Sequence, residues 1–224
     1  QQGICVADSA GQIARQCRRT VLCLPTSQDV AACVAEMKAE LPSGAIVIDT
    51  TTGDPQTAVA LAEQLRAHGA NLIDATVLGS SAQVRTREIA LMVGGEDDAV
   101  AQCNDIFAAL SDKVFHLGPT GSGQRMKLVT NLVLGLNRAV LAEGLHFAAS
   151  CGLDLPKVLE VLQSGAAYSR VMETKGVKML AEDFTPQARL AQHRKDVRLI
   201  LAQAERGGAT LPLSQLHCEL LERA

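Results

Sequence analysis

The chain has 224 residues, of which 47% are hydrophobic and 20% charged, and its formal net charge at pH 7 is −3. These values fit a globular protein of one large or two small domains, and they exclude a strongly basic surface for nucleic acid. The chain has no Trp, one Tyr and four Phe, so we do not expect binding of bases or sugars by aromatic stacking to be its principal activity.

The seven cysteines and five histidines are scattered, without a C-x-x-C pair or a metal-ligand spacing. That pattern is typical of reduced thiols and predicts neither a disulfide framework nor a metal site. No apolar run of transmembrane length is free of charge, and no signal peptide is visible. We therefore expect a cytoplasmic protein without membrane contacts.

The first half of the chain alternates short apolar runs with helix-like segments. We predict strands at residues 4–8, 20–25, 44–52, 71–79, 89–95 and 113–118. Between them we predict helices at residues 9–19 and 96–110 and two that begin near Ser27 and Pro55. Ser9 and Ser27 are the expected N-caps, and Pro55 suits a first helical turn. Strands that alternate with helices predict a mainly parallel α/β sheet.

In such a sheet, ligands bind at the carboxyl ends of the strands. Three of these ends are short polar or Gly-containing segments, at residues 24–27, 49–54 and 75–81. Each is a candidate cofactor or substrate contact. Turns use the same residue types, so for any single segment an ordinary turn remains the alternative.

The pattern changes at Gly118, after which no strand-like run follows. We predict a long helix over residues 122–150 and shorter helices in the rest of the chain. We place the boundary at residue 119, which gives an α/β domain at residues 1–119 and an all-α domain at residues 120–224. The long helix is apolar around nearly its whole circumference, which predicts burial on most sides.

Lys127 lies in the first turns of this long helix, and Asn131 follows four residues later on the same face. The positive end of the helix dipole disfavours a cation at that position. An amine held there is a candidate proton donor or acceptor near neutral pH. Taken alone, a lysine at this position is explained far more often as a surface side chain at a helix end.

Six segments in this order carry a resemblance to a known family: LCLPTSQDV, IVIDTTTGDP, IDATVLGS, LMVGG, GSGQRMKLVTN and HRKDVRL. The most specific are the G-x-G-x-x-x-K-x-x-x-N pattern from Gly121 to Asn131 and the Lys195–Asp196 pair. The chain resembles the β-hydroxyacid dehydrogenases, such as 3-hydroxyisobutyrate dehydrogenase and tartronate semialdehyde reductase, which are related to 6-phosphogluconate dehydrogenase. The resemblance implies a partial Rossmann-like, doubly wound parallel sheet followed by an all-α domain.

The resemblance also implies roles for individual residues. Lys127 matches the family's general acid/base, which moves a proton at the reacting oxygen, and Asn131 matches the asparagine that orients the substrate. NAD or NADP is the implied cofactor. Its implied contacts are Leu24, Pro25, Thr26, Thr52 and Lys195, with Asp196 holding Lys195 or its helix in place.

The substrate segment departs from the family pattern D-x-P-V-S-G-G, because Leu78 stands in place of the serine. The backbone N–H groups of Gly79 and Ser80 remain as the implied substrate contacts, and Ser80 can supply the missing hydroxyl. We expect a larger or less polar substrate than 3-hydroxyisobutyrate. Further on, Arg87 replaces a glycine of the family pattern. This change leaves open that the chain is a degenerate member of the family without activity.

The dinucleotide fingerprint G-x-G-x-x-G is not found after a first strand, and the chain opens on QQGICVAD without Met. We expect this sequence to be part of a longer protein, the alternative being a shortened protein that does not bind NAD in the family's way.

Three functions remain open from the sequence. The first is an NAD(P)-dependent oxidoreductase acting on a small β-hydroxy acid or semialdehyde. The second is a non-catalytic binding or oligomerisation module on the same fold. The third is an imine-reducing relative, against which Lys127 argues. In all three we expect a homodimer or homotetramer formed through the all-α domain.

Overall fold

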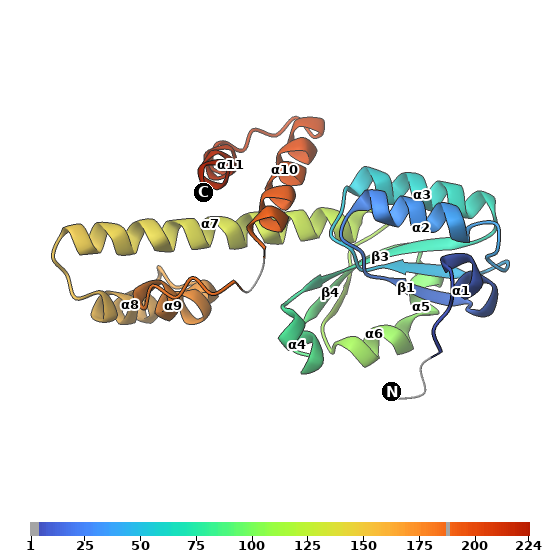
Figure 1. The fold of residues 1–224 in the computed structure, drawn as a ribbon, viewed down its shortest axis with the longest axis horizontal. Helices are drawn as coiled ribbons and strands as arrows, with labels where there is room; N and C mark the ends of the chain where they lie inside the picture. The colour runs from blue at the N-terminus through green and yellow to red at the C-terminus, as the bar shows by residue number, and fades with distance from the viewer. Residues whose placement is uncertain (1–4, 187–188) are drawn as a thin grey trace. The chain divides into compact units, whose positions relative to one another are not determined.

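The computed structural model describes residues 5–186 and 189–224 of the chain. It consists of two compact units, Gln1–Leu128 and Val129–Ala224, shown in Figure 1. The division lies inside one continuous helix, nine residues beyond the boundary expected at residue 119.

The first unit contains a five-stranded sheet in the order β1-β2-β3-β4-β5. Its strands are β1 Arg19–Leu22, β2 Ile46–Asp49, β3 Asn71–Leu78, β4 Ala90–Gly94 and β5 Val114–His116. All neighbouring pairs are parallel except β3 and β4, which are antiparallel. Residues 79–89 connect this pair, and a parallel pair would need a crossover of about a dozen residues or more. The expectation of a mainly parallel sheet is confirmed.

The helices of the first unit are α1 Ala10–Gln16, α2 Ser27–Met37, α3 Pro55–Ala67, α4 Ser81–Arg85, α5 Asp97–Ala101 and α6 Asn104–Leu110. Two predictions are wrong in detail. The single helix expected at residues 96–110 is divided into α5 and α6, and α2 is capped by Thr26 rather than Ser27. The strand expected at residues 4–8 is also wrong for residues 5–8, while residue 4 lies outside the described residues.

Two apolar clusters form the core, one on each face of the sheet. Val47 of β2 packs with residues of α1, α2 and α3, including Val34 and Leu65. Ile48, the next residue of the same strand, packs with α5 and α6 through Val100 and Phe107. Alternate side chains of a strand point to opposite faces, so helices cover both faces of the sheet (Figure 1). The doubly wound α/β fold is confirmed.

The regular elements of the second unit, among its described residues, are all helical. It contains most of α7 Ser122–Ser150, then α8 Leu155–Ser164, a π-helical turn Met172–Gly176, α9 Val177–Leu180, α10 Leu190–Arg206 and α11 Pro212–Arg223. Its apolar core is formed by α7, α8 and the π-helical turn, through Leu141, Leu145, Leu159, Val171 and Met172.

The expected burial of α7 on most sides is wrong for the single chain. Val133 is 50% exposed, Val140 68% and Phe147 69%. These residues follow one another at intervals of seven, so they form one exposed apolar stripe. By length and composition alone α7 could also cross a membrane, a test that core helices of soluble proteins pass as well.

Candidate functional site

Two loops at the carboxyl edge of the sheet, residues 24–26 after β1 and residues 51–54 after β2, are held side by side. The backbone N–H of Leu24 donates to Thr51 Oγ1 at 3.0 Å. The backbone N–H of Asp54 donates to Ser27 Oγ at 2.7 Å. These bonds place the predicted cofactor contacts of both loops next to each other.

Both loops fit a dinucleotide in position and in chemistry. The four predicted contacts here are uncharged: Leu24, Thr26 and Thr52 are half-buried, and Pro25 is exposed. Thr26 also caps α2 by accepting a hydrogen bond from Asp29 N at 3.2 Å. The start of α2 therefore lies at the same edge, where the partial positive charge of a helix N-terminus favours anionic groups. Doubly wound sheets bind nucleotides at this edge.

The middle of β3 is bonded to the start of α7 through Asp74. The N–H of Gly121 donates to Asp74 Oδ1 and the N–H of Gln124 to Asp74 Oδ2, each at 2.7 Å. Asp74 is fully buried. Burial raises its pKa to about 7, against these two hydrogen bonds, which lower it. Asp74 thus supplies acceptors to backbone donors that have no partner within the helix itself.

Gln124 joins the same turn to the loop after β2. Its Oε1 accepts from Gly53 N at 2.9 Å, and its Nε2 donates to Thr51 O at 2.7 Å. The side chain is 1% exposed, so both ends of the amide are satisfied inside the protein. Sequence reasoning missed this residue, which is the polar residue next to Gly123 in the G-x-G pattern.

Gly123 allows the closest approach of α7 to the sheet. A Cβ added there would lie against Met92 O and 2.7 Å from Asp74 O, both backbone atoms of neighbouring strands. Thr76 Oγ1 donates to Gly123 O at 3.0 Å across the same contact. The absence of a side chain at this position therefore sets the distance between the helix and β3.

Lys127 lies one turn further along α7, where its Nζ donates to the carbonyl oxygen of Val77 at 2.6 Å. The side chain is half-buried. Its neighbour Leu128 is 3% exposed, whereas Met126 is 37% exposed. The amine is thus held at the last residues of β3, two positions before Gly79.

Gly79 and Ser80 begin the connection from β3 to β4, and both are exposed. Gly79 has a φ of 154°, a conformation that favours glycine. The Ser80 hydroxyl takes part in a capping box of α4, donating to Gln83 Oε1 at 3.0 Å and accepting from Gln83 N at 3.3 Å. The Ser80 backbone N–H also donates to Gln83 Oε1, at 2.9 Å. Both donors of Ser80 are therefore bonded to Gln83, and the backbone N–H of Gly79 is the donor that remains for a substrate at the end of β3.

In the helical unit, Asp196 joins Asn131 and Lys195. Asn131 Nδ2 donates to Asp196 Oδ2 at 3.0 Å, and Lys195 Nζ lies 3.4 Å from Asp196 Oδ1. Asn131 and Asp196 are each 8% exposed. Three residues singled out from the sequence thus form one polar group built from α7 and α10.

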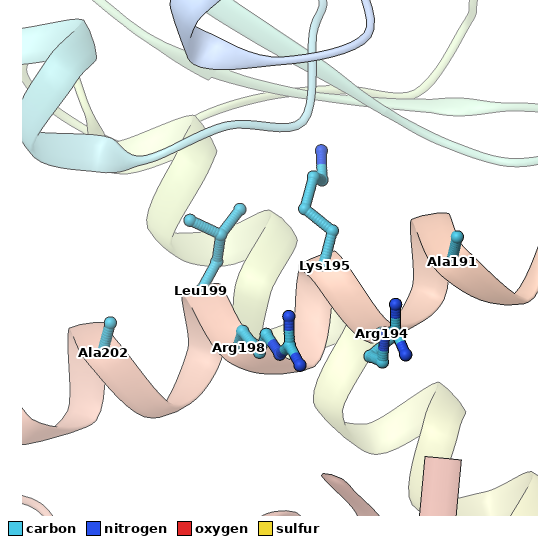
Figure 2. A pocket seen from close by; sticks show the side chains of 6 residues that line it. All are labelled: Ala191, Arg194, Lys195, Arg198, Leu199 and Ala202. Carbon is cyan, nitrogen blue, oxygen red and sulfur yellow. The ribbon is translucent and has the colours of Figure 1, made fainter. Parts of the chain in front are cut away.

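Lys195 also lines a hollow of about 360 Å³ on one face of α10. Figure 2 shows its side chain extending away from that helix, with Arg194 directly before it in the chain and Arg198 about one turn after it. The full lining consists of Ala191, Arg194, Lys195, Arg198, Leu199 and Ala202. Three cationic side chains give this hollow a positive character that suits an anionic ligand.

The predicted site residues thus fall into three groups. The first group, at the ends of β1 and β2, contains Leu24, Pro25, Thr26 and Thr52. The second group, at the end of β3, contains Gly79, Ser80 and the amine of Lys127. The third group, in the helical unit, contains Asn131 and Lys195. Lys127 and Asn131 are four residues apart on α7, with the unit boundary between them. Within the described part of the chain, no group of three or more His, Cys, Asp or Glu residues could hold a metal ion.

Two family models match the chain. Residues 1–118 match the NAD binding domain of 6-phosphogluconate dehydrogenase, and residues 121–224 match the NAD-binding domain of NADP-dependent 3-hydroxyisobutyrate dehydrogenase.

Curated relatives cover the same regions. The chain is 30% identical to 2-hydroxy-3-oxopropionate reductase of Escherichia coli over 169 residues, which is 75% of this chain and 58% of that protein. It is 29% identical over 214 residues to a probable mitochondrial 3-hydroxyisobutyrate dehydrogenase-like protein 1 of Arabidopsis thaliana, which is 94% of this chain and 64% of that protein.

Among solved structures, 3-hydroxyisobutyrate dehydrogenase of Mycobacterium tuberculosis with L-serine has a TM-score of 0.92 and 24% identity, covering 99% of this chain and 78% of that one. This likeness shows the fold. The chain spans less than two thirds of the length of either curated relative.

Proposed function

The chain belongs to the family of the NAD binding domain of 6-phosphogluconate dehydrogenase, and from this premise we propose that it is part of an NAD(P)-dependent oxidoreductase. The substrate class is a small β-hydroxy acid or its semialdehyde, as the names of the relatives indicate. One observation carries the proposal: the amine of Lys127 is held 2.6 Å from Val77 O, at the strand end that continues into Gly79.

The loops after β1 and β2 are the proposed cofactor contacts. NAD or NADP, when bound, supplies or accepts the hydride. Leu24 and Thr26 would lie along the dinucleotide, and Thr52 would supply a polar contact. The hydrogen bond from Leu24 N to Thr51 Oγ1 keeps the two loops in register. Such prior positioning lowers the entropy lost on binding.

Lys127 is the proposed general acid/base. It would donate a proton to the substrate carbonyl oxygen in one direction and remove the hydroxyl proton in the other. The Val77 carbonyl restricts where its Nζ can lie, and the backbone N–H of Gly79 next to it is a donor for the substrate carboxylate. Positioning of this kind lowers the barrier because the reacting groups need no further ordering.

Asn131 and Lys195 are the proposed contacts from the helical unit. The Asn131 amide nitrogen donates to Asp196, which fixes the orientation of the amide and directs its oxygen elsewhere as an acceptor. Asp196 also neutralises part of the Lys195 charge at 3.4 Å. The presence of this whole group, together with Lys127, supports an active enzyme over a non-catalytic module.

The test uses the longest natural protein that contains this sequence. We expect NAD(P)H turnover with one or more β-hydroxy acids or semialdehydes from a panel. Lys127→Ala is expected to lower kcat by about 100-fold or more, because a positioned acid/base is lost. Lys157→Ala, at an exposed lysine of α8, is the matched control and should keep the full rate. A Lys127→Ala enzyme with wild-type kcat would refute the assignment.

We also propose a homodimer or homotetramer assembled through the helical unit. The support is the exposed apolar stripe on α7, which includes Val133, Val140 and Phe147. Exposed apolar surface of this extent is typical of protein interfaces. Sedimentation or light scattering should give a mass of at least two chains, and a monomer at micromolar concentration would contradict the proposal.

A cytoplasmic location is likewise proposed. Its support is that all seven cysteines are free, as expected in a reducing compartment. Fractionation of cells that express the tagged protein would test it, and recovery from an oxidising compartment would contradict it.

A further inference from the structure

The connection from β3 to β4, residues 79–89, carries two predicted substrate contacts but has almost no buried surface of its own. Every residue from Gly79 to Glu88 is exposed except the half-buried Gln83. Its short helix α4 buries none of its residues. Apolar packing therefore cannot fix the shape of this connection, and specific contacts at its ends must do so.

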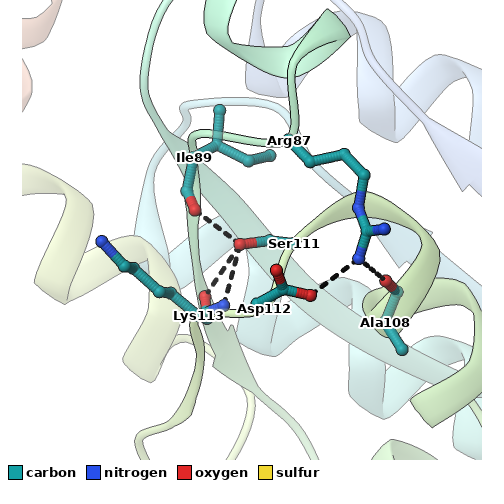
Figure 3. A network of polar contacts seen from close by, with 6 residues as sticks. All are labelled: Arg87, Ile89, Ala108, Ser111, Asp112 and Lys113. Carbon is teal, nitrogen blue, oxygen red and sulfur yellow. Dashed lines mark hydrogen bonds and ion pairs between the residues drawn. The ribbon is translucent and has the colours of Figure 1, made fainter.

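The first of these contacts joins its two ends. Ile89 is 3% exposed, and a Cβ added to Gly79 would lie 2.6 Å from Ile89 Cγ2. The Ile89 side chain thus packs directly against the backbone of Gly79. The buried hydroxyl of Ser111 in turn donates to Ile89 O (Figure 3). The turn after α6 therefore sets the position of Ile89, and Ile89 limits the position of Gly79.

The second contact is made by Arg87. Its Nη2 donates to Ala108 O and to Asp112 Oδ1, each at 2.7 Å, as Figure 3 shows. Ala108 O belongs to the last turn of α6, where carbonyl oxygens lack partners within the helix and cations are favoured. One side chain thus binds the connection to the end of α6 through two acceptors.

The backbone of Arg87 is in the left-handed region, with a φ of 61°. This conformation is uncommon for residues other than glycine. From the sequence, arginine in place of the family's glycine left open a degenerate enzyme. In the structure Arg87 adopts a left-handed conformation that glycine also allows, and it makes two hydrogen bonds that a glycine cannot make.

We propose that Arg87 is a positioning residue for the substrate: by binding the β3–β4 connection to α6, it fixes the backbone donor at Gly79. The inference rests on the proposed function. Arg87 acts through the connection and touches neither substrate nor cofactor. The expected consequence is that fewer acids are accepted as substrates, because the carboxylate must fit a backbone donor whose position is fixed.

Steady-state kinetics of Arg87→Gly in the complete enzyme test this role. Glycine adopts a φ near 60° without strain, so this variant removes the two hydrogen bonds and keeps the backbone. We expect the KM for the acid to rise by about three- to tenfold, with a smaller change in kcat and an unchanged KM for NAD(P)H. Asp112→Asn, which keeps the Ala108 bond, should give a smaller rise. Arg87→Lys, which keeps one cationic donor, should partly restore the wild-type KM.

Arg66→Ala is the matched control, since Arg66 forms an exposed ion pair with Glu96 at 2.9 Å on another part of the first unit. It should leave the KM unchanged. Hydrogen–deuterium exchange gives a readout independent of turnover: Arg87→Gly should speed exchange in residues 79–88, and Arg66→Ala should not.

The outcomes separate the two proposals. An active Arg87→Gly enzyme with an unchanged KM, or with unchanged exchange in residues 79–88, overturns the positioning role alone. A wild-type protein that turns over no acid or semialdehyde overturns the proposed function, and with it the role of Arg87 in substrate binding.

Discussion

Replacement of Gly123 by alanine tests the close contact between α7 and the sheet. In an ordinary helix this change stabilises the protein by about 0.5–1 kcal/mol, because glycine loses more backbone entropy. Here the new methyl group would lie against Met92 O and 2.7 Å from Asp74 O. Both atoms belong to the backbone of paired strands, so neither can move aside without disturbing the sheet.

The helix must therefore move, and the cost can be worked from the contacts that it makes. Overpacking of this kind costs about 1–3 kcal/mol. Lengthening the two 2.7 Å bonds to Asp74 adds about 0.5–1.5 kcal/mol for each bond that is lost. If both bonds are lost, these costs less the gain of about 0.5–1 kcal/mol leave a net loss of about 1–5 kcal/mol, which corresponds to a melting temperature lower by about 2–20 °C for a chain of this size.

Thermal unfolding followed by circular dichroism measures the effect. Gly144→Ala is the matched control, because Gly144 lies on the same helix and an added Cβ would meet nothing within 4 Å. We expect the control to be slightly more stable than the wild type. A Gly123→Ala protein as stable as the wild type would refute the argument from packing. A less stable Gly144→Ala protein would instead indicate that a second chain covers that face of α7.

Three further predictions concern buried polar groups. Burial raises the pKa of Asp74 to about 7, above its value of about 3.9 in an unfolded chain. The folded state therefore holds the carboxyl proton more tightly, and the stability that this contributes at low pH is lost as the pH rises through 7. Urea unfolding should therefore show a larger advantage of wild type over Asp74→Asn at pH 5.5 than at pH 8; the opposite order would mean that the backbone hydrogen bonds to the carboxylate dominate. Burial, with smaller contributions from His217 and Arg138, lowers the pKa of His193 to about 4, below its value of about 6.5 when unfolded. The wild type should then lose stability between pH 6.5 and pH 4, and His193→Gln should lose less; equal losses would contradict this. Asp196→Ala should lower kcat by more than its loss of thermal stability can explain, because Asn131 loses the acceptor that orients its amide. A wild-type kcat at saturating substrate would contradict the positioning role of Asp196.

Much of the α/β unit could be predicted because its signals are local. Short apolar runs predicted the strands, and Pro55 predicted the start of α3, which Asp54 caps in the structure. Errors occurred where local signals compete. Thr26 and Ser27 are both good caps, and the structure uses the first. Residues 5–8 have strand-like composition, but no described strand pairs with them.

The candidate site was only partly predictable. The general rule for ligand position in parallel sheets identified the loops after β1, β2 and β3. The roles of Asp74 and Gln124 could not be read in the same way, because their partners lie 47 to 73 residues away in the sequence. The conformation of Arg87 was also beyond local reasoning, since its two acceptors come from the last turn of α6 and the segment after it, 21 and 25 residues away in the sequence.

The division of the chain inside α7 has a consequence for sequence variation. Most pairs of domains are joined by loops, which tolerate added or deleted residues. Between Leu128 and Asn131 the chain is helical, so one inserted residue would rotate everything beyond it by about 100° around the helix axis. Asn131 would then leave the face that carries Lys127. In this stretch we expect substitutions to be tolerated far better than insertions or deletions of any length that is not close to a whole number of helical turns.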